Sequence, residues 1–102
     1  MTGGPGGHAR HRLDPHLSGA VRLSIMATLA TVQEIEFGAL RDVVEVTDST
    51  LSKQLTALES IGYVQIRKGY FGKRPRTWVS CSATGHRSYD DHVRALQQVL
   101  GI

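Results

Sequence analysis

The chain has 102 residues, of which 40% are hydrophobic, and a formal net charge of +3. This length fits one small domain, and the hydrophobic content is too high for a disordered chain. A single cysteine excludes an intrachain disulfide and a cysteine-cluster zinc site. Because the chain lacks an apolar run of about 18 residues and a secretory signal, we expect a cytoplasmic protein without a membrane partner.

The N-terminal part of the chain divides near Asp14. Residues 1–13 are rich in glycine and basic side chains, and we expect them to form a flexible arm. Residues 14–102 should form one domain. Asp14 and Pro15 are a typical N-cap and first helical residue, which predicts a helix to about Ala30. Apolar side chains cover most of its circumference, so we expect it to be buried on more than one side.

Two short elements follow. Residues 34–37 alternate between polar and apolar side chains, which is typical of a very short strand. Apolar side chains then recur at helical spacing from Phe37 to Val44, which predicts a second helix that ends near Glu45.

A third helix has the clearest pattern in the chain. Thr47 is a good N-cap, and the helix is predicted from Asp48 to Ile61, with Gly62 in the position of a left-handed C-terminal residue. Its apolar side chains are three and four residues apart and predict a buried face, namely Leu51, Leu55, Leu58 and Ile61.

A β-hairpin and a last helix complete the order. Residues 63–68 and 77–81 alternate as strands do, and residues 69–76 should form a long tip. Cys81 alternates inward and is expected to be a small buried hydrophobe. Ser82 can cap the last helix. The sequence therefore predicts a mainly α, α+β domain in the order helix, short strand, helix, helix, hairpin, helix.

The second and third helices, joined by a tight turn, have the pattern of a helix-turn-helix. Short polar side chains on the outer face of the third helix would let its backbone approach the floor of the DNA major groove. Asp48 is expected only to stabilise the helix N-terminus, and Thr50 to point nearer the domain. The candidate contacts are Ser49, Ser52, Lys53 and Thr56. An ordinary solvated helix face is the alternative.

The hairpin is strongly basic. Residues 62–88 contain six of the twelve lysines and arginines and no acidic residue. Such a segment suits the phosphate backbone or the minor groove of DNA. The candidate contacts are Lys68, Lys73, Arg74 and Arg76. The alternative is a charged loop that keeps the protein soluble.

Residues 46–55 and 58–64 resemble the recognition helix and first wing strand of MarR-like winged-helix regulators, and residues 82–85 resemble the segment that ends the wing. The resemblance implies a winged helix-turn-helix that binds a palindromic DNA site as a homodimer. Recognition helices would occupy successive major grooves, and wings the adjacent minor grooves. The longer terminal helices of many MarR proteins are missing here, which leaves a small-molecule effector open.

The first and last helices are too apolar for one small core, which predicts a dimer interface. The expected interface residues are Leu17, Val21, Tyr89, Val93, Leu96 and Leu100. Packing of the two helices against each other within one chain is the alternative.

The remaining residues do not form a metal-binding or catalytic motif. Three histidines near the N-terminus lack further ligands for a metal, and His86 and His92 are each expected to be exposed. No catalytic set appears, so neither an enzyme nor a cofactor is expected. We expect a transcriptional regulator of the repressor type that binds double-stranded DNA. The alternatives are a protein-interaction module for an acidic partner and an RNA-binding protein.

Overall fold

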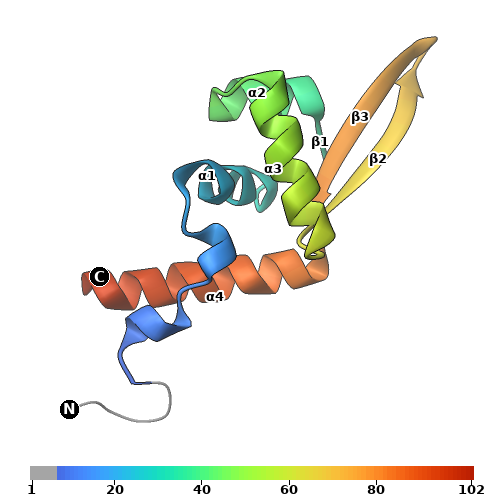
Figure 1. Cartoon of the computed structure of the whole chain (residues 1–102). Coiled ribbons are helices and arrows are strands. Elements are labelled where there is room, and N and C mark those ends of the chain that lie inside the picture. The colour runs from blue at the N-terminus through green and yellow to red at the C-terminus, as the bar shows by residue number, and fades with distance from the viewer. Residues whose placement is uncertain (1–6) are drawn as a thin grey trace.

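The structure, a computed structural model, describes residues 7–102. Its helices are α1 (Ala20–Leu29), α2 (Phe37–Val44), α3 (Asp48–Ser60) and α4 (Ala83–Leu100), with short 3₁₀ helices η1 (Ala9–Arg12) and η2 (Pro15–Leu17). Its strands are β1 (Ile35–Glu36), β2 (Val64–Phe71) and β3 (Arg74–Cys81). The helices α1, α2 and α3 group together, the β2–β3 hairpin projects away from them, and α4 runs past their base (Figure 1). The predicted class and element order are confirmed.

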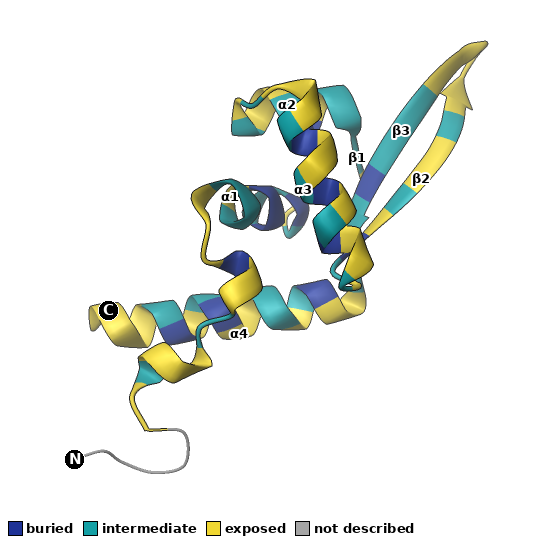
Figure 2. Ribbon diagram, in the orientation of Figure 1, coloured by how far each residue is buried: buried dark blue, intermediate teal, exposed yellow. Residues whose placement is uncertain are grey.

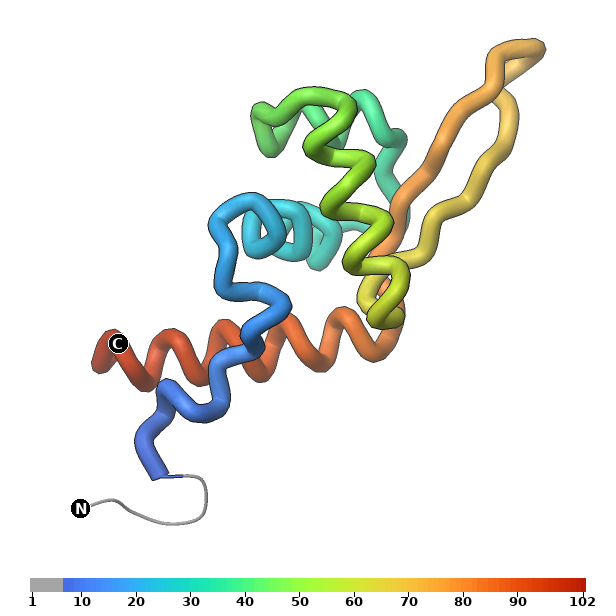
Figure 3. Tube along the Cα trace, viewed as in Figure 1, coloured from blue at the N-terminus to red at the C-terminus, as the bar shows by residue number. Residues whose placement is uncertain are grey.

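The sheet is antiparallel, in the order β1-β3-β2. Strand β1 pairs with β3 only at Ile35 opposite Val79 and Glu36 opposite Trp78. Strands β2 and β3 pair along their whole length, to Phe71 opposite Arg74. Beyond its base, the hairpin is therefore a two-stranded ribbon (Figure 3).

The core lies where the three grouped helices meet the base of the hairpin. Figure 2 shows buried residues on the facing sides of these helices, whereas the outer part of the hairpin is exposed or intermediate. The leucines of α3 point inward, as their spacing predicts. The buried apolar cluster comprises Leu17, Ile25, Met26, Leu29, Leu40, Leu51, Leu55, Leu58, Val64 and Val79.

The helix predicted from Asp14 to about Ala30 is interrupted. Asp14 does cap a helix, since its carboxylate accepts a hydrogen bond from the His16 N–H at 2.8 Å, but η2 ends at Leu17. The Ser18 hydroxyl then donates to the Pro15 carbonyl at 2.8 Å, and Gly19 is extended before α1 begins. Local side-chain bonds of this kind compete with helical ones, which explains the break.

The N-terminal arm also differs from the expectation where it is described. Residues 1–6 lie outside the described residues. Ala9–Arg12 forms η1 beside α4 (Figures 1 and 3), and the Arg12 guanidinium donates to the Gln98 side-chain oxygen. The His8 side chain accepts from the Arg10 N–H at 3.0 Å and caps η1. This part of the arm is thus ordered against α4.

The hairpin closes more tightly than predicted. Its loop is two residues, Gly72 and Lys73, and Gly72 has a φ of +64°, as the first position of a type II′ turn requires. Pro75 suggested a long tip, but it lies within β3 beside the closing pair of the turn. Opposite residues of an antiparallel ladder alternate between hydrogen-bonded and non-hydrogen-bonded pairs. Position 75 belongs to a non-hydrogen-bonded pair, where an N–H would point away from β2, so proline costs no hydrogen bond of the ladder.

The prediction that His92 is exposed is wrong. His92 is only 3% exposed, on the inner face of α4 with Gly85 and Ala95. Its Nδ1 accepts a hydrogen bond from the Asp14 N–H at 2.9 Å. The spacing between His92 and His86 does not reveal this inner face.

Within residues 7–102, no helix is both long and apolar enough to cross a membrane.

Candidate nucleic-acid interface

Helix α3 presents a polar outer face. The Thr47 hydroxyl accepts from the Thr50 N–H at 3.2 Å and so caps the helix, while Thr50 itself is half-buried, as predicted. The Thr56 hydroxyl donates to the Ser52 carbonyl at 2.9 Å. All four predicted contacts on this helix are exposed, namely Ser49, Ser52, Lys53 and Thr56.

Arg41 of α2 forms an ion pair with Asp48 of α3, a contact that sequence reasoning missed. Its Nη1 lies 2.8 Å from Asp48 Oδ1, and its Nε lies 3.0 Å from Asp42 Oδ1. Hydrogen bonds to Asp48 and then Asp42 raise the pKa of Arg41 above its ordinary value. Glu45, with a φ of 55°, ends α2 in the left-handed conformation. The carboxylate of Asp48 is therefore occupied by α2.

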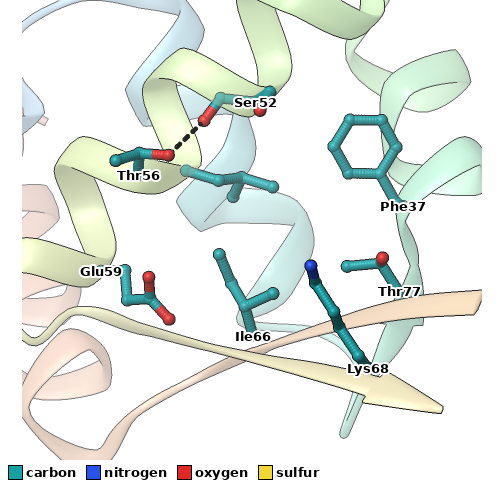
Figure 4. A pocket seen from close by; sticks show the side chains of 8 residues that line it. Phe37, Ser52, Thr56, Glu59, Ile66, Lys68 and Thr77 are labelled. Carbon is teal, nitrogen blue, oxygen red and sulfur yellow. Dashed lines mark hydrogen bonds between the residues drawn. The ribbon is translucent and has the colours of Figure 1, made fainter.

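A groove of about 580 Å³ lies between α3 and the hairpin. Figure 4 shows Ser52 and Thr56 on one side of it and Lys68 on the other, with the Lys68 ammonium directed into the space between them. Three predicted contacts, two from α3 and one from β2, are thus brought together. Glu59, which sequence reasoning did not select, also lines the groove.

The basic residues of the hairpin differ in their surroundings. Within residues 7–102, Lys68, Lys73 and Arg74 are exposed and form no ion pair. Arg76 is half-buried: its Nη1 lies 3.9 Å from Glu36 Oε2, and its guanidinium carbon lies 6.0 Å from the centre of the Phe71 ring. Arg76 is therefore partly neutralised by the protein itself.

Arg67 is engaged more completely. Its Nε and Nη2 donate to the two carboxylate oxygens of Glu34 at 3.0 and 2.7 Å. Its guanidinium carbon lies 5.5 Å from the centre of the Trp78 ring. The hydrogen bonds from Arg67 lower the pKa of Glu34, so this pair stays charged at neutral pH.

The predicted dimer residues separate into two groups. Leu17 has no exposed surface, because it packs in the chain's own core; its assignment to a dimer surface is corrected to the intrachain alternative. Val21 and Tyr89 are half-buried against the same core, whereas Val93 and Leu96 are half-buried along α4. The end of α4 is open, with Leu100 61% exposed beside exposed Val99 and Ile102.

The fold is a winged helix-turn-helix. Two helices are joined by a tight turn, the second helix has a polar exposed face, and a projecting basic hairpin follows. The family model described as a winged helix DNA-binding domain matches residues 21–100, and the chain belongs to this family. The winged helix-turn-helix that the sequence predicted is confirmed.

Known proteins share this architecture over most of the chain. An uncharacterized protein of Methanocaldococcus jannaschii is 27% identical over 79 residues, which cover 78% of this chain and 86% of the relative. The structure of a transcriptional regulator homologue from Pyrococcus horikoshii OT3 is 28% identical and has a TM-score of 0.79, covering 84% of this chain and 85% of that one. A MarR mutant from E. coli, solved with operator DNA, has a TM-score of 0.74 at 20% identity, covering 91% and 66%. At that identity the likeness shows the fold alone.

Proposed function

We propose that the protein is a transcriptional regulator that binds specific sequences in double-stranded DNA. It acts as a homodimer on an inverted repeat and represses transcription by occupying its site. Helix α3 enters the major groove, and the β2–β3 hairpin, the wing, lies on the backbone or in the adjacent minor groove. The observation that carries this proposal is the shared groove, where Ser52 and Thr56 of α3 face Lys68 of the wing, which forms no ion pair with the described residues 7–102.

The outer face of α3 suits the major groove because its side chains are short. The major groove is about 12 Å wide and admits a helix whose side chains reach base edges. Serine and threonine hydroxyls can both donate and accept hydrogen bonds there. Lys53, exposed on the same face, adds a donor for a guanine or a phosphate. The solved relatives, one of which holds operator DNA, support this placement.

The end of α4 supports the homodimer. A small domain buries a smaller fraction of its surface than a large one does, and exposed apolar side chains at a helix end favour association. Leu100 is the most exposed residue of the predicted interface, and Val93 and Leu96 continue the same side of α4 toward the core. A twofold dimer places two copies of α3 on symmetric half-sites.

The test is selection of bound duplexes from a random DNA pool, together with the mass of the protein in solution. We expect an enriched inverted repeat with half-sites about one helical turn apart, bound by a dimer. Binding to the selected duplex should weaken steeply with salt. No enrichment by the folded protein, together with a copurifying acidic protein, would instead support the interaction module. Preference for structured RNA over duplex DNA would support the RNA-binding alternative.

A further inference from the structure

The two faces of the wing differ in chemistry. Side chains alternate between the faces of a strand, and the β2–β3 register assigns each one. The front face, on the side of α3, carries Ile66, Lys68 and Tyr70 of β2 with Pro75 and Thr77 of β3. The rear face carries Arg67, Gly69 and Phe71 of β2 with Arg74, Arg76 and Trp78 of β3, Arg74 being exposed beside the turn.

Two arginines of the rear face form contacts within the protein. Glu34 holds Arg67 through two hydrogen bonds, and Glu36 lies 3.9 Å from Arg76. Each arginine also lies over an aromatic ring of the same face. Gly69 makes room for this arrangement, because a Cβ there would come within 2.9 Å of Nη1 of Arg67.

The front face is open. The groove beside α3 reaches Lys68 and Thr77, and a second hollow continues from these two residues to Tyr70 and Pro75, near the turn. Gly69 and Arg76 also line this second hollow. Tyr70 is 75% exposed, and no hydrogen bond of its hydroxyl is formed within residues 7–102. A tyrosine has an apolar ring and a polar tip, so it can pack on a sugar and donate to a phosphate at once.

We propose that the wing meets DNA with its front face and its tip, residues 72–74, and not with Arg67 and Arg76 of its rear face. This inference rests on the proposed function. Lys68 and Tyr70 contact the DNA backbone beside the groove that α3 occupies, the Tyr70 hydroxyl donating to a phosphate oxygen. Arg67 and Arg76 are positioning residues: held by Glu34 and Glu36, they brace the ribbon at its angle to α3. Two of the five basic residues of the wing are thus paired with acidic side chains of the protein itself.

Neighbouring residues on opposite faces give matched variants. Lys68→Gln and Arg67→Gln each remove one cation from adjacent positions of β2. Tyr70→Ala and Phe71→Ala each remove an aromatic side chain of similar exposure, 75% and 71%. Affinity for the selected duplex is measured by fluorescence anisotropy between low and high salt, and thermal melting shows that each variant is folded.

We expect Lys68→Gln to lower the slope of log affinity against log salt by about 1, and Arg67→Gln to leave that slope unchanged. Tyr70→Ala and Tyr70→Phe should each weaken binding by about tenfold, the size of one lost hydrogen bond to a charged group. Phe71→Ala should change it by less than about twofold. Glu34→Gln keeps Arg67 but removes its carboxylate partner. It should reduce affinity as much as Arg67→Gln does and again leave the salt slope unchanged. Arg67→Lys should bind more tightly than Arg67→Gln, although less tightly than the wild type.

A smaller salt slope in Arg67→Gln, or tighter binding by Glu34→Gln, would show that Arg67 contacts DNA and would overturn the inference. An effect of Phe71→Ala as large as that of Tyr70→Ala would also overturn it. Failure of the proposed function is distinguishable, because the wild-type protein itself would then show no salt-dependent, sequence-selective binding to duplex DNA.

Discussion

Asp14 joins three segments of the chain. Its backbone N–H donates to His92 of α4, and its carboxylate accepts from the His16 N–H and from the Tyr63 hydroxyl. Tyr63 lies between α3 and β2, so Asp14 connects the N-terminal segment, the base of the wing and α4. Burial, and then the hydrogen bond to Asp14, raise the pKa of Tyr63. The folded protein therefore favours the neutral phenol.

The variant Tyr63→Phe should alter the alkaline limit of stability. A pKa raised by folding contributes stability below the unfolded value, about 10 for tyrosine, and this contribution is lost as the pH rises through the folded value. We expect the urea midpoint of the wild type to fall more than that of Tyr63→Phe between about pH 9 and about pH 11. The other tyrosines are common to both proteins, so parallel curves would contradict the assigned role of Tyr63.

Gly85 allows α4 to approach the corner between α3 and β2. A Cβ at this position would overlap the Tyr63 carbonyl oxygen, lie 2.9 Å from the carbonyl carbon and lie 3.0 Å from Cys81 Sγ. That oxygen also accepts the Ser82 N–H at 3.0 Å, so it is not free to move. Although alanine is the better helix former, we expect Gly85→Ala to lower the free energy of unfolding in urea by about 1–3 kcal/mol, as overpacking does.

The control for this prediction is Gly19→Ala. Gly19 precedes α1 with a φ of −83°, and no atom lies within 4 Å of the position of its Cβ. The unfolding free energy should change by no more than about 0.5 kcal/mol. Equal effects of the two substitutions would mean that the contact with Tyr63 does not decide the outcome.

At the scale of elements, prediction from sequence succeeded where local signals agreed. Helix α3 was placed within one residue, because its threonine cap and its leucine spacing are both local. The predicted extent of the first helix was wrong because the hydrogen bond of Ser18 does not follow from a spacing pattern. The predicted length of the hairpin tip was wrong because the edge position of Pro75 does not follow from such a pattern either. The tightness of the turn could be recognised only from the register.

The candidate site was predictable to the same extent. The exposed polar face of α3 and the basic character of the wing follow from periodicity and composition. The division of the wing into two faces does not, because Arg67 and its partner Glu34 are 33 residues apart in the sequence. The groove beside α3 likewise appears only when the wing is folded against that helix.

The two DNA-binding elements should respond differently to substitution. Ser52→Ala and Lys53→Ala on α3 should change the order of preferred sequences when selection from the random pool is repeated, since direct contacts to bases carry specificity. Arg74→Ala, beside the turn of the wing, should weaken binding to all sequences and lower the salt slope by about 1. Uniform weakening by the α3 variants would make them backbone contacts, and an unchanged slope would remove Arg74 from the interface.

For the whole molecule, dimerisation is the property to test. Leu100→Glu introduces a charge at the open end of α4, away from the buried core, so the subunit should still fold. We expect sedimentation to show a monomer, and binding to the inverted repeat to weaken toward that to a single half-site. Val43→Glu is a matched control on α2, since Val43 is 58% exposed against 61% for Leu100. A dimer that survives Leu100→Glu would place the interface elsewhere.

The wing also has an exposed strand edge through which separate molecules could associate. Since β1 covers β3 only at Val79 and Trp78, the outer edge of the ribbon offers unpaired backbone groups to which a foreign strand could add. Pro75 interrupts this row because it has no N–H to offer, and its neighbours Arg74 and Arg76 repel another copy of the same edge. Pro75, which resembled a loop breaker in the sequence, thus removes one donor from the exposed edge of β3, whereas β2, the outer strand of the sheet, contains no proline.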